Sequence, residues 1–168
     1  MDVELRQVTL DEKEILRNLL EKYDYEFSQW DRRDVNPLGL YGYPFLDHYW
    51  TDCKRWAYFI LVDKKLAGFA MVNNYQEAFD RETDFQLAEF FVLYKYRHYG
   101  VGRQAFFKVL GLHRGRWQLK LHPLNLVSVQ FWGSVITEYT TGRFELVRAY
   151  PKTEYDDGTL GDIYFFES

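Results

Sequence analysis

A short glycine loop between two apolar segments constrains the fold of this 168-residue chain more than any other feature. Residues 85–93 end in the apolar run FFVL, which predicts a central strand buried on both faces. Residues 100–113 have the apolar spacing of a helix. The connection between them reads RHYGVGR over residues 97–103. A strand, a glycine loop and a helix in this order are typical of an α/β fold in which the first amides of the helix hold an anion.

Hydrophobic periodicity predicts the remaining elements. Strands are expected over residues 3–8, 55–62, 66–72, 117–121, 144–150 and 159–166, the last two forming a hairpin with a turn at 156–158. A capping box at Thr9 and Glu12 begins a helix that is expected to end near Tyr25, and Asn125 is the expected N-cap of a later helix. Residues 24–52 are expected to form a loop with short helical pieces. This order predicts an α/β sandwich around a mixed sheet, with residues 1–168 as one domain.

Charge is distributed unevenly along the chain. Residues 90–137 carry seven Lys and Arg and no Asp or Glu, although the whole chain has a net charge of −4. This basic window without acids indicates a bound anion. The alternative is that the basic residues cluster by chance on a solvated face. Nucleic acid is a weaker hypothesis, because the acidic flanks would repel a phosphate backbone and no recognition motif accompanies the basic residues.

Composition excludes several classes of protein. A hydrophobic content of 47% is ordinary for a globular chain, and the single cysteine, Cys53, cannot form an intramolecular disulfide. No Cys/His cluster has zinc spacing, and no apolar run has the length of a membrane span. The chain begins without a signal-peptide pattern. We therefore expect a cytoplasmic protein with no metal and no membrane partner, either a monomer or a homodimer.

The glycine loop matches two known patterns. Gly100, Gly102 and Ala105 satisfy G-x-G-x-x-A, the dinucleotide-binding pattern, which expects an acidic residue about 20 positions further on. Position 120 is a lysine and the next acid is Glu138, so this interpretation fails its own requirement.

The same loop also reads R-x-x-G-x-G and follows a strand that ends Phe91-Val92-Leu93. Further on, Asn125 precedes the aromatic pair Phe131-Trp132 on the next expected helix. Together these residues resemble the GNAT superfamily of N-acetyltransferases over nearly the whole chain. The resemblance implies a mixed, mostly antiparallel sheet of about six to seven strands with helices on both faces, and acetyl-CoA as co-substrate.

The resemblance also implies a CoA site. In the family, the strand before the loop and the strand after its helix splay apart, and the pantetheine arm pairs with the first of them. The residues expected to bind CoA are Phe91, Val92 and Leu93 for pantetheine, the amides of His98, Tyr99, Gly100, Val101, Gly102 and Arg103 for the pyrophosphate, and Asn125 and Trp132. Arg97 and Arg103 flank the loop and are the expected side-chain contacts to phosphate. Lys108, Arg114 and Arg116 are expected to be solvated.

Glu89 is the expected general base, because it is the last acid before the basic window and lies on the strand that leads into the loop. Burial beside Phe90 and Phe91 would raise its pKa toward neutrality. The alternative is an outward-facing glutamate in a salt bridge. Trp132 occupies the position where many relatives have a tyrosine that protonates the thiolate, and an indole cannot deliver that proton. The acid is unassigned among Tyr139 and the tyrosines of residues 23–49.

Residues 23–52 combine six acids with nine aromatic side chains, and in GNAT relatives this region covers the acceptor site. Acids and aromatic faces suit a cationic amine, so we expect a polyamine, aminoglycoside-like or peptidyl amine acceptor. The alternative is that the aromatic residues are core and the acids a solvated rim. A second functional class is a catalytically silent acyl-CoA-binding sensor or interaction module of the same fold, which Trp132 favours.

Overall fold

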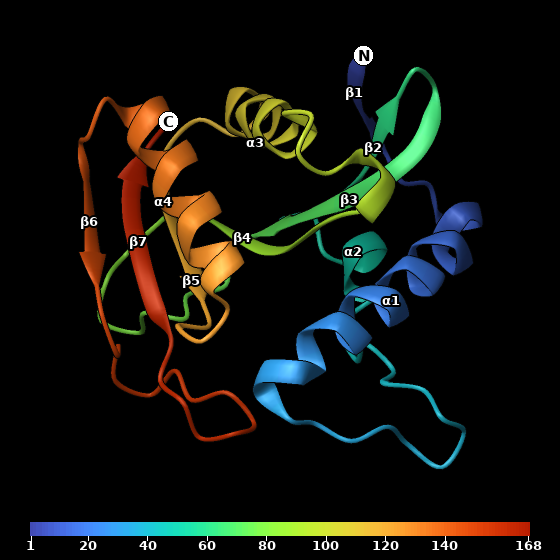
Figure 1. Cartoon of the computed structure of the whole chain (residues 1–168), viewed down its shortest axis with the longest axis horizontal. Coiled ribbons are helices and arrows are strands. Elements are labelled where there is room, and N and C mark those ends of the chain that lie inside the picture. Colours follow the sequence, from blue (N-terminus) through green and yellow to red (C-terminus); the bar gives the residue numbers. More distant parts are fainter.

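The computed structural model describes residues 1–168 as a seven-stranded sheet with the order β1-β2-β3-β4-β5-β7-β6 (Figure 1). The strands are β1 Val3–Gln7, β2 Arg55–Val62, β3 Lys65–Asn73, β4 Phe85–Val92, β5 Arg116–Leu121, β6 Phe144–Val147 and β7 Asp162–Glu167. Only β4 and β5 run parallel; every other neighbouring pair is antiparallel. The prediction of a mixed, mostly antiparallel sheet is confirmed.

Four α-helices accompany the sheet: α1 Lys13–Asp31, α2 His48–Thr51, α3 Val101–Leu112 and α4 Leu126–Thr140. Single 3₁₀ turns precede α1 at Leu10–Glu12 and α3 at Tyr94–Tyr96. The capping box between Thr9 and Glu12 is present, as predicted. None of the helices combines the length and the apolar composition that a membrane span requires.

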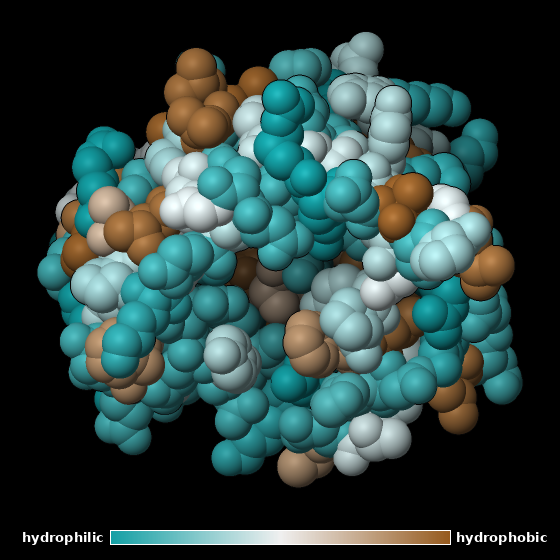
Figure 2. Space-filling view, turned by 90° about the horizontal axis from the view of Figure 1, so that it is seen from below, coloured by the Kyte–Doolittle hydropathy of each residue, from teal (hydrophilic) through white to brown (hydrophobic).

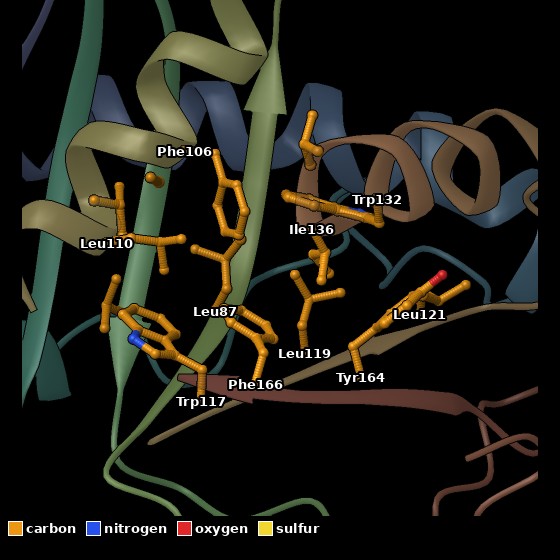
Figure 3. Close-up of a cluster of buried hydrophobic side chains, with 14 residues drawn as sticks. Leu87, Phe106, Leu110, Trp117, Leu119, Leu121, Trp132, Ile136, Tyr164 and Phe166 are labelled. Atoms are coloured by element: carbon orange, nitrogen blue, oxygen red, sulfur yellow. The ribbon is translucent and has the colours of Figure 1, made fainter. Parts of the chain in front are cut away.

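The helices cover both faces of the sheet. On β3, Ala70 and Val72 belong to a core cluster with α3 and α4, whereas Phe69 and Met71 face a second cluster with α1 and α2. Figure 3 shows the first cluster, in which Phe106 of α3 and Trp132 of α4 extend toward side chains of the strands. The central strands are therefore buried on both faces, as their apolar runs predict.

Helix α1 is longer than the sequence predicts. It continues past Tyr25 to Asp31 and ends at Arg32, whose φ of 63° is left-handed. The prediction was wrong because residues 26–31 look like the start of the polar, aromatic loop, yet no proline or glycine interrupts the helix before Arg32. Residues 26–31 therefore extend α1 instead of beginning the loop.

The two C-terminal strands pair as predicted, but not through a tight hairpin. Strand β6 ends at Val147 and β7 begins at Asp162. The expected turn does form, with Tyr155 N donating to Thr159 O and Gly158 in a left-handed conformation. It is the tip of a longer loop, residues 148–161, in which Glu154 and Leu160 form an isolated bridge.

Strand β4 contains one extra residue and then diverges from β5. Met71 of β3 pairs with Glu89 while Val72 pairs with Leu87, so Ala88 forms a bulge. Strands β4 and β5 pair only at Phe85–Trp117 and Gln86–Gln118. Beyond these pairs the sheet opens, and the β4 backbone that would face β5 has no strand partner.

Candidate active site

A cleft of about 1220 Å³ lies where β4 and β5 diverge. Its walls come from α1, β4, β5, the start of α3, α4 and the loop after β6. Figure 2 shows a hollow with an apolar floor and a mostly hydrophilic rim, near the centre of the face seen from below. The divergence of β4 and β5 thus brings predicted site residues from distant segments to one place.

One end of the cleft carries the predicted anion loop. Gln104 N, which donates to Gly100 O, makes the first backbone hydrogen bond of α3. The six amides before it, from His98 to Arg103, donate to no backbone acceptor. His98 and Gly100 both have left-handed φ angles, of 66° and 75°. A run of unpaired amides at a helix N-terminus is a cradle suited to phosphate.

Close packing against α4 also favours glycine at position 102. A Cβ at this position would lie 3.1 Å from Cζ of Phe131 on α4, closer than side chains normally pack. The first turn of α3 therefore packs directly on the Phe131 ring. The glycine loop shapes the contact between α3 and α4 as well as the anion cradle.

Both arginines of the loop make two-pronged ion pairs with glutamates. Arg97 donates to both carboxylate oxygens of Glu26 on α1 at 2.8 Å. Arg103 donates to both oxygens of Glu138 on α4, with Nε to Oε2 at 2.7 Å. One arginine beside the cradle therefore pairs with α1 and the other with α4, which cover opposite faces of the sheet.

The other predicted CoA residues divide into two groups. Phe91, Val92 and Trp132 line the cleft, and Trp132 also belongs to the core beneath α4. Asn125 lines the cleft and caps α4, accepting from Ser128 N at 3.0 Å. Leu93 packs against the core instead, and the Tyr99 side chain is exposed, so neither side chain lines the cleft.

Glu89 lies in the cleft because of the β4 bulge. Leu87 faces α3 and α4, and regular alternation would turn Glu89 the same way. The extra residue Ala88 turns Glu89 toward the face of α1, where its partner Met71 and the following Phe91 also pack. No salt bridge forms at Glu89, so the alternative of an outward, ion-paired glutamate is not observed.

The surroundings of Glu89 favour its neutral form. Burial raises the pKa of Glu89 to about 7, the polar Tyr23 hydroxyl opposes the rise, and the nearby Asp24 carboxylate adds to it. Burial likewise raises the pKa of Asp24 to about 6, although the Arg33 guanidinium lowers it. A carboxyl with a pKa near 7 is suited to accept a proton at neutral pH.

One face of α1 forms a wall of the cleft and reaches the glycine loop through Glu26. Tyr23, Glu26, Phe27 and Trp30 follow the i, i+3, i+4, i+7 spacing of a single helix face, and all four line the cleft. These four side chains belong to the segment that is expected to cover the acceptor, and the structure places them in the cleft.

Most other acids of that region have structural partners. Arg33 pairs with Asp24 at 3.2 Å and with Asp31 at 2.8 Å. Asp47 pairs with Lys13 and Asp52 with Arg55. The aromatic residues Tyr43, Tyr49 and Trp50 pack in the core cluster beneath α1 and α2. The alternative interpretation, core aromatics with a rim of acids, describes this part of the segment.

The loop after β6 contributes residues that sequence reasoning missed. Tyr155 lies 5.7 Å from Phe27 and 4.6 Å from His122, measured between ring centres, and so closes the cleft between α1 and β5. Lys120 of β5 lies 4.2 Å from the centre of the Tyr155 ring and pairs with Glu77 at 3.5 Å. In this loop only the turn residues form a recognisable sequence pattern, and that pattern predicts a turn. It does not indicate that the loop lines a functional site.

A second hollow, of about 820 Å³, lies at the opposite end of β5 and β7. It contains Tyr139, whose hydroxyl accepts from Arg114, and Arg116, which pairs with Asp84. Tyr139 is therefore remote from Glu89, and the two arginines lie outside the cleft. Of the predicted candidates for the proton donor, Tyr23 is the tyrosine that lines the cleft beside Glu89.

Residues 14–134, most of the chain, match the model of the acetyltransferase (GNAT) family. The chain belongs to the GNAT acetyltransferase family. It is therefore an acyltransferase, and the sequence-based prediction of the family is confirmed. No curated protein matches the chain at a significant level.

Solved GNAT structures share the fold. An acetyltransferase from Thermus thermophilus has a TM-score of 0.70 at 14% identity, covering 100% of this chain and 98% of its own. The PaiA N-acetyltransferase of Thermoplasma acidophilum, in complex with coenzyme A, has a TM-score of 0.64 at 12% identity over 100% of both chains. NAA60 of Arabidopsis thaliana, in complex with a bisubstrate analogue, has a TM-score of 0.65 at 12% identity, covering 99% and 98%. These similarities establish the GNAT fold.

Proposed function

We propose that this GNAT protein transfers the acetyl group of acetyl-CoA to a primary amine of a small, cationic acceptor by direct attack in a ternary complex. The acceptor class includes polyamines, aminoglycoside-like amines and peptidyl amines. One observation carries the proposal: a single cleft joins a cradle of unpaired amides to a partly buried carboxyl, that of Glu89. Desolvation there raises the pKa of Glu89 to about 7. The complexes of PaiA with coenzyme A and of NAA60 with a bisubstrate analogue support it.

The lining of the cleft offers groups suited to each part of CoA. The amides from His98 to Arg103 would hold the pyrophosphate, and the unpaired edge of β4 beyond Gln86 would hydrogen-bond the amide groups of pantetheine. Phe91, Val92 and Trp132 would form the apolar wall beside the pantetheine arm. The thioester would then lie where β4 bulges, next to Glu89.

The proposed reaction needs one base. The neutral amine attacks the thioester carbonyl carbon, the carbon–sulfur bond breaks, and sulfur leaves as the CoA thiolate. The proton lost by the amine passes to the Glu89 carboxylate, directly or through one water. The thiolate is a good leaving group, and the Trp132 indole has no acidic proton to give it, so no acid is assigned to this step.

Acceptor binding is assigned to the wall that α1 and the loop after β6 form. Tyr23, Phe27, Trp30 and Tyr155 present aromatic faces there, and Glu26 lies on the same face of α1. Aromatic faces and carboxylates attract ammonium groups through cation–π contact and ion pairing.

Release of free thiol from acetyl-CoA tests the proposal. We expect thiol release that depends on added spermidine, kanamycin or a lysine-containing peptide, and much less with glutamate or aspartate as the amine. A preference for the anionic amines would contradict the cationic acceptor. Binding of acetyl-CoA with no amine-dependent thiol release would point to a sensor module instead.

A further inference from the structure

The two arginine–glutamate pairs beside the anion cradle differ in their surroundings. The Arg97 and Glu26 side chains are 23% and 20% exposed, and both line the cleft. The Arg103 and Glu138 side chains are 44% and 48% exposed. Electrostatic interactions are stronger in the less exposed pair, because solvent screens it less.

Arg97 is held from several sides. Its Nε donates to Val92 O, the last carbonyl of β4, at 2.7 Å. Its guanidinium carbon lies 4.1 Å from the centre of the Tyr94 ring and 5.4 Å from that of Phe91. These contacts, which do not involve Glu26, hold the guanidinium at the junction of the β4 edge and the amide cradle.

Glu26 links this junction to the acceptor wall. It lies one turn after Tyr23, which lines the cleft with Glu89, and next to Phe27, which contacts Tyr155. The Glu26 carboxylate is therefore within the same face of α1 that we assign to the acceptor, yet its charge is neutralised by a residue of the CoA side.

We propose that Arg97 exchanges the Glu26 carboxylate for the CoA pyrophosphate, and that the released Glu26 then binds the cationic acceptor. The inference rests on the proposed function. A guanidinium fork fits a carboxylate and a phosphate with the same geometry. Two anions at one partly buried guanidinium repel each other, so the ligand with the larger charge displaces Glu26.

The exchange makes the two binding events cooperative. Without CoA, an acceptor must compete with Arg97 for Glu26; with CoA bound, that competition ends. Because coupling between two ligands is reciprocal, a bound acceptor also strengthens CoA binding by the same factor. Acetyl-CoA followed by the amine is then the favoured order of binding.

The substitution Glu26→Gln tests the CoA side of the exchange. It keeps the side-chain size and removes the charge, so CoA no longer displaces a carboxylate. We expect CoA, measured by calorimetry, to bind about fivefold more tightly to the variant. Pantetheine lacks the phosphates, so its affinity should be the same in the variant and the wild type, which also reports that the cleft is folded.

Glu138→Gln is the matched control, since it makes the same chemical change in the exposed pair on the other side of the cradle. We expect its CoA affinity to change by less than about twofold, because solvent already screens that pair. Unchanged or weaker CoA binding by Glu26→Gln would overturn the exchange, and would mean that Glu26 only orients Arg97.

Spermidine, a polycation, tests the acceptor side. We expect its dissociation constant for the wild type to fall when CoA is added, and this effect to disappear in Glu26→Gln and persist in Glu138→Gln. If the wild type does not bind spermidine, or binds it equally well with and without CoA, the release of Glu26 is contradicted.

The two proposals fail in different ways. A wild-type protein that binds no CoA would contradict the proposed function itself. A wild-type protein that binds CoA and acetylates amines, combined with a Glu26→Gln variant of unchanged CoA affinity and unchanged acceptor KM, would leave the function intact and overturn only the exchange.

Discussion

Burial raises the pKa of Glu89 from 4.5 to about 7, so the charge of this residue changes within the neutral pH range. The folded chain thereby holds a proton on Glu89 that the unfolded chain loses at lower pH. Its contribution to stability is present below pH 4.5 and is lost as the pH rises through about 7. In the proposed reaction, the form that accepts the proton is the ionised form, which predominates above that pH.

We therefore expect the rate of acetyl transfer to rise with pH and to level off above an apparent pKa near 7. Glu89→Gln should lower kcat by about 10²- to 10⁴-fold and remove this limb of the pH profile. Steady-state kinetics between pH 5.5 and 9 measure both effects.

Glu14→Gln, on an exposed part of α1, is the control and should leave the profile unchanged. If the rate of the Glu89→Gln variant still rises with pH as in the wild type, the group responsible for that rise is not Glu89. At pH 8 the variant should be at least as stable as the wild type, since it no longer buries a charge.

At the scale of elements, the contact between α3 and α4 depends on Gly102. The first turn of α3 approaches the Phe131 ring so closely that a Cβ would have to displace it. The same turn supplies the amides of the anion cradle. A change in how α3 packs on α4 would therefore also change the site proposed for CoA.

Gly102→Ala should lower the free energy of unfolding and weaken CoA binding, because the added methyl group separates α3 from Phe131. Gly111→Ala provides the comparison in the same helix, since a Cβ there meets nothing within 4 Å. It should stabilise the protein by up to about 1 kcal/mol through helix propensity alone. Urea denaturation and calorimetry with CoA measure the two variants, and equal effects of the two would contradict the packing argument.

The bulge in β4 is the other element on which the site depends. One extra residue, Ala88, places Glu89 on the face of α1 instead of the face of α3 and α4. The divergence of β5 begins at the same level of the strand, after Gln86. The carboxyl and the open strand edge thus meet at one point of the sheet.

Across the whole molecule, different buried titratable groups make the stability of the fold change with pH in opposite directions. Burial lowers the pKa of His113, whose Nε2 lies 2.8 Å from the Tyr58 hydroxyl and whose ring lies among aromatic side chains. Since its folded pKa lies below 6.5, His113 costs no stability above that pH and destabilises the fold as the pH falls. Glu89 and Asp24, whose pKa values are raised, have the opposite effect.

We expect the pH-dependent contribution of His113 to be measurable as a difference in the free energy of unfolding between the wild type and a variant without this histidine. His113→Gln cannot take up the proton, so the free energy of unfolding of the wild type should fall relative to this variant between pH 7.5 and pH 5. Urea denaturation at the two pH values measures it. A difference that does not change with pH would show that His113 does not titrate in this range.

The sequence by itself determined the family, the order of the elements and the position of the glycine loop before α3. Each depends on neighbours in the chain: the capping box at Thr9, the period of the apolar residues, and glycines at the start of α3. The same local reasoning failed where no local signal exists, at the end of α1 and in the long loop after β6.

Only the tertiary structure decided which face Glu89 occupies, that Glu26 pairs with Arg97 across 71 positions of sequence, and that Tyr155 closes the cleft over Phe27. The physical reason is that strand register and contacts between distant segments follow from the packing of the whole core. A single extra residue in β4 reverses the side of the sheet on which the proposed base lies, and neither its neighbours nor its spacing in the chain reveals it.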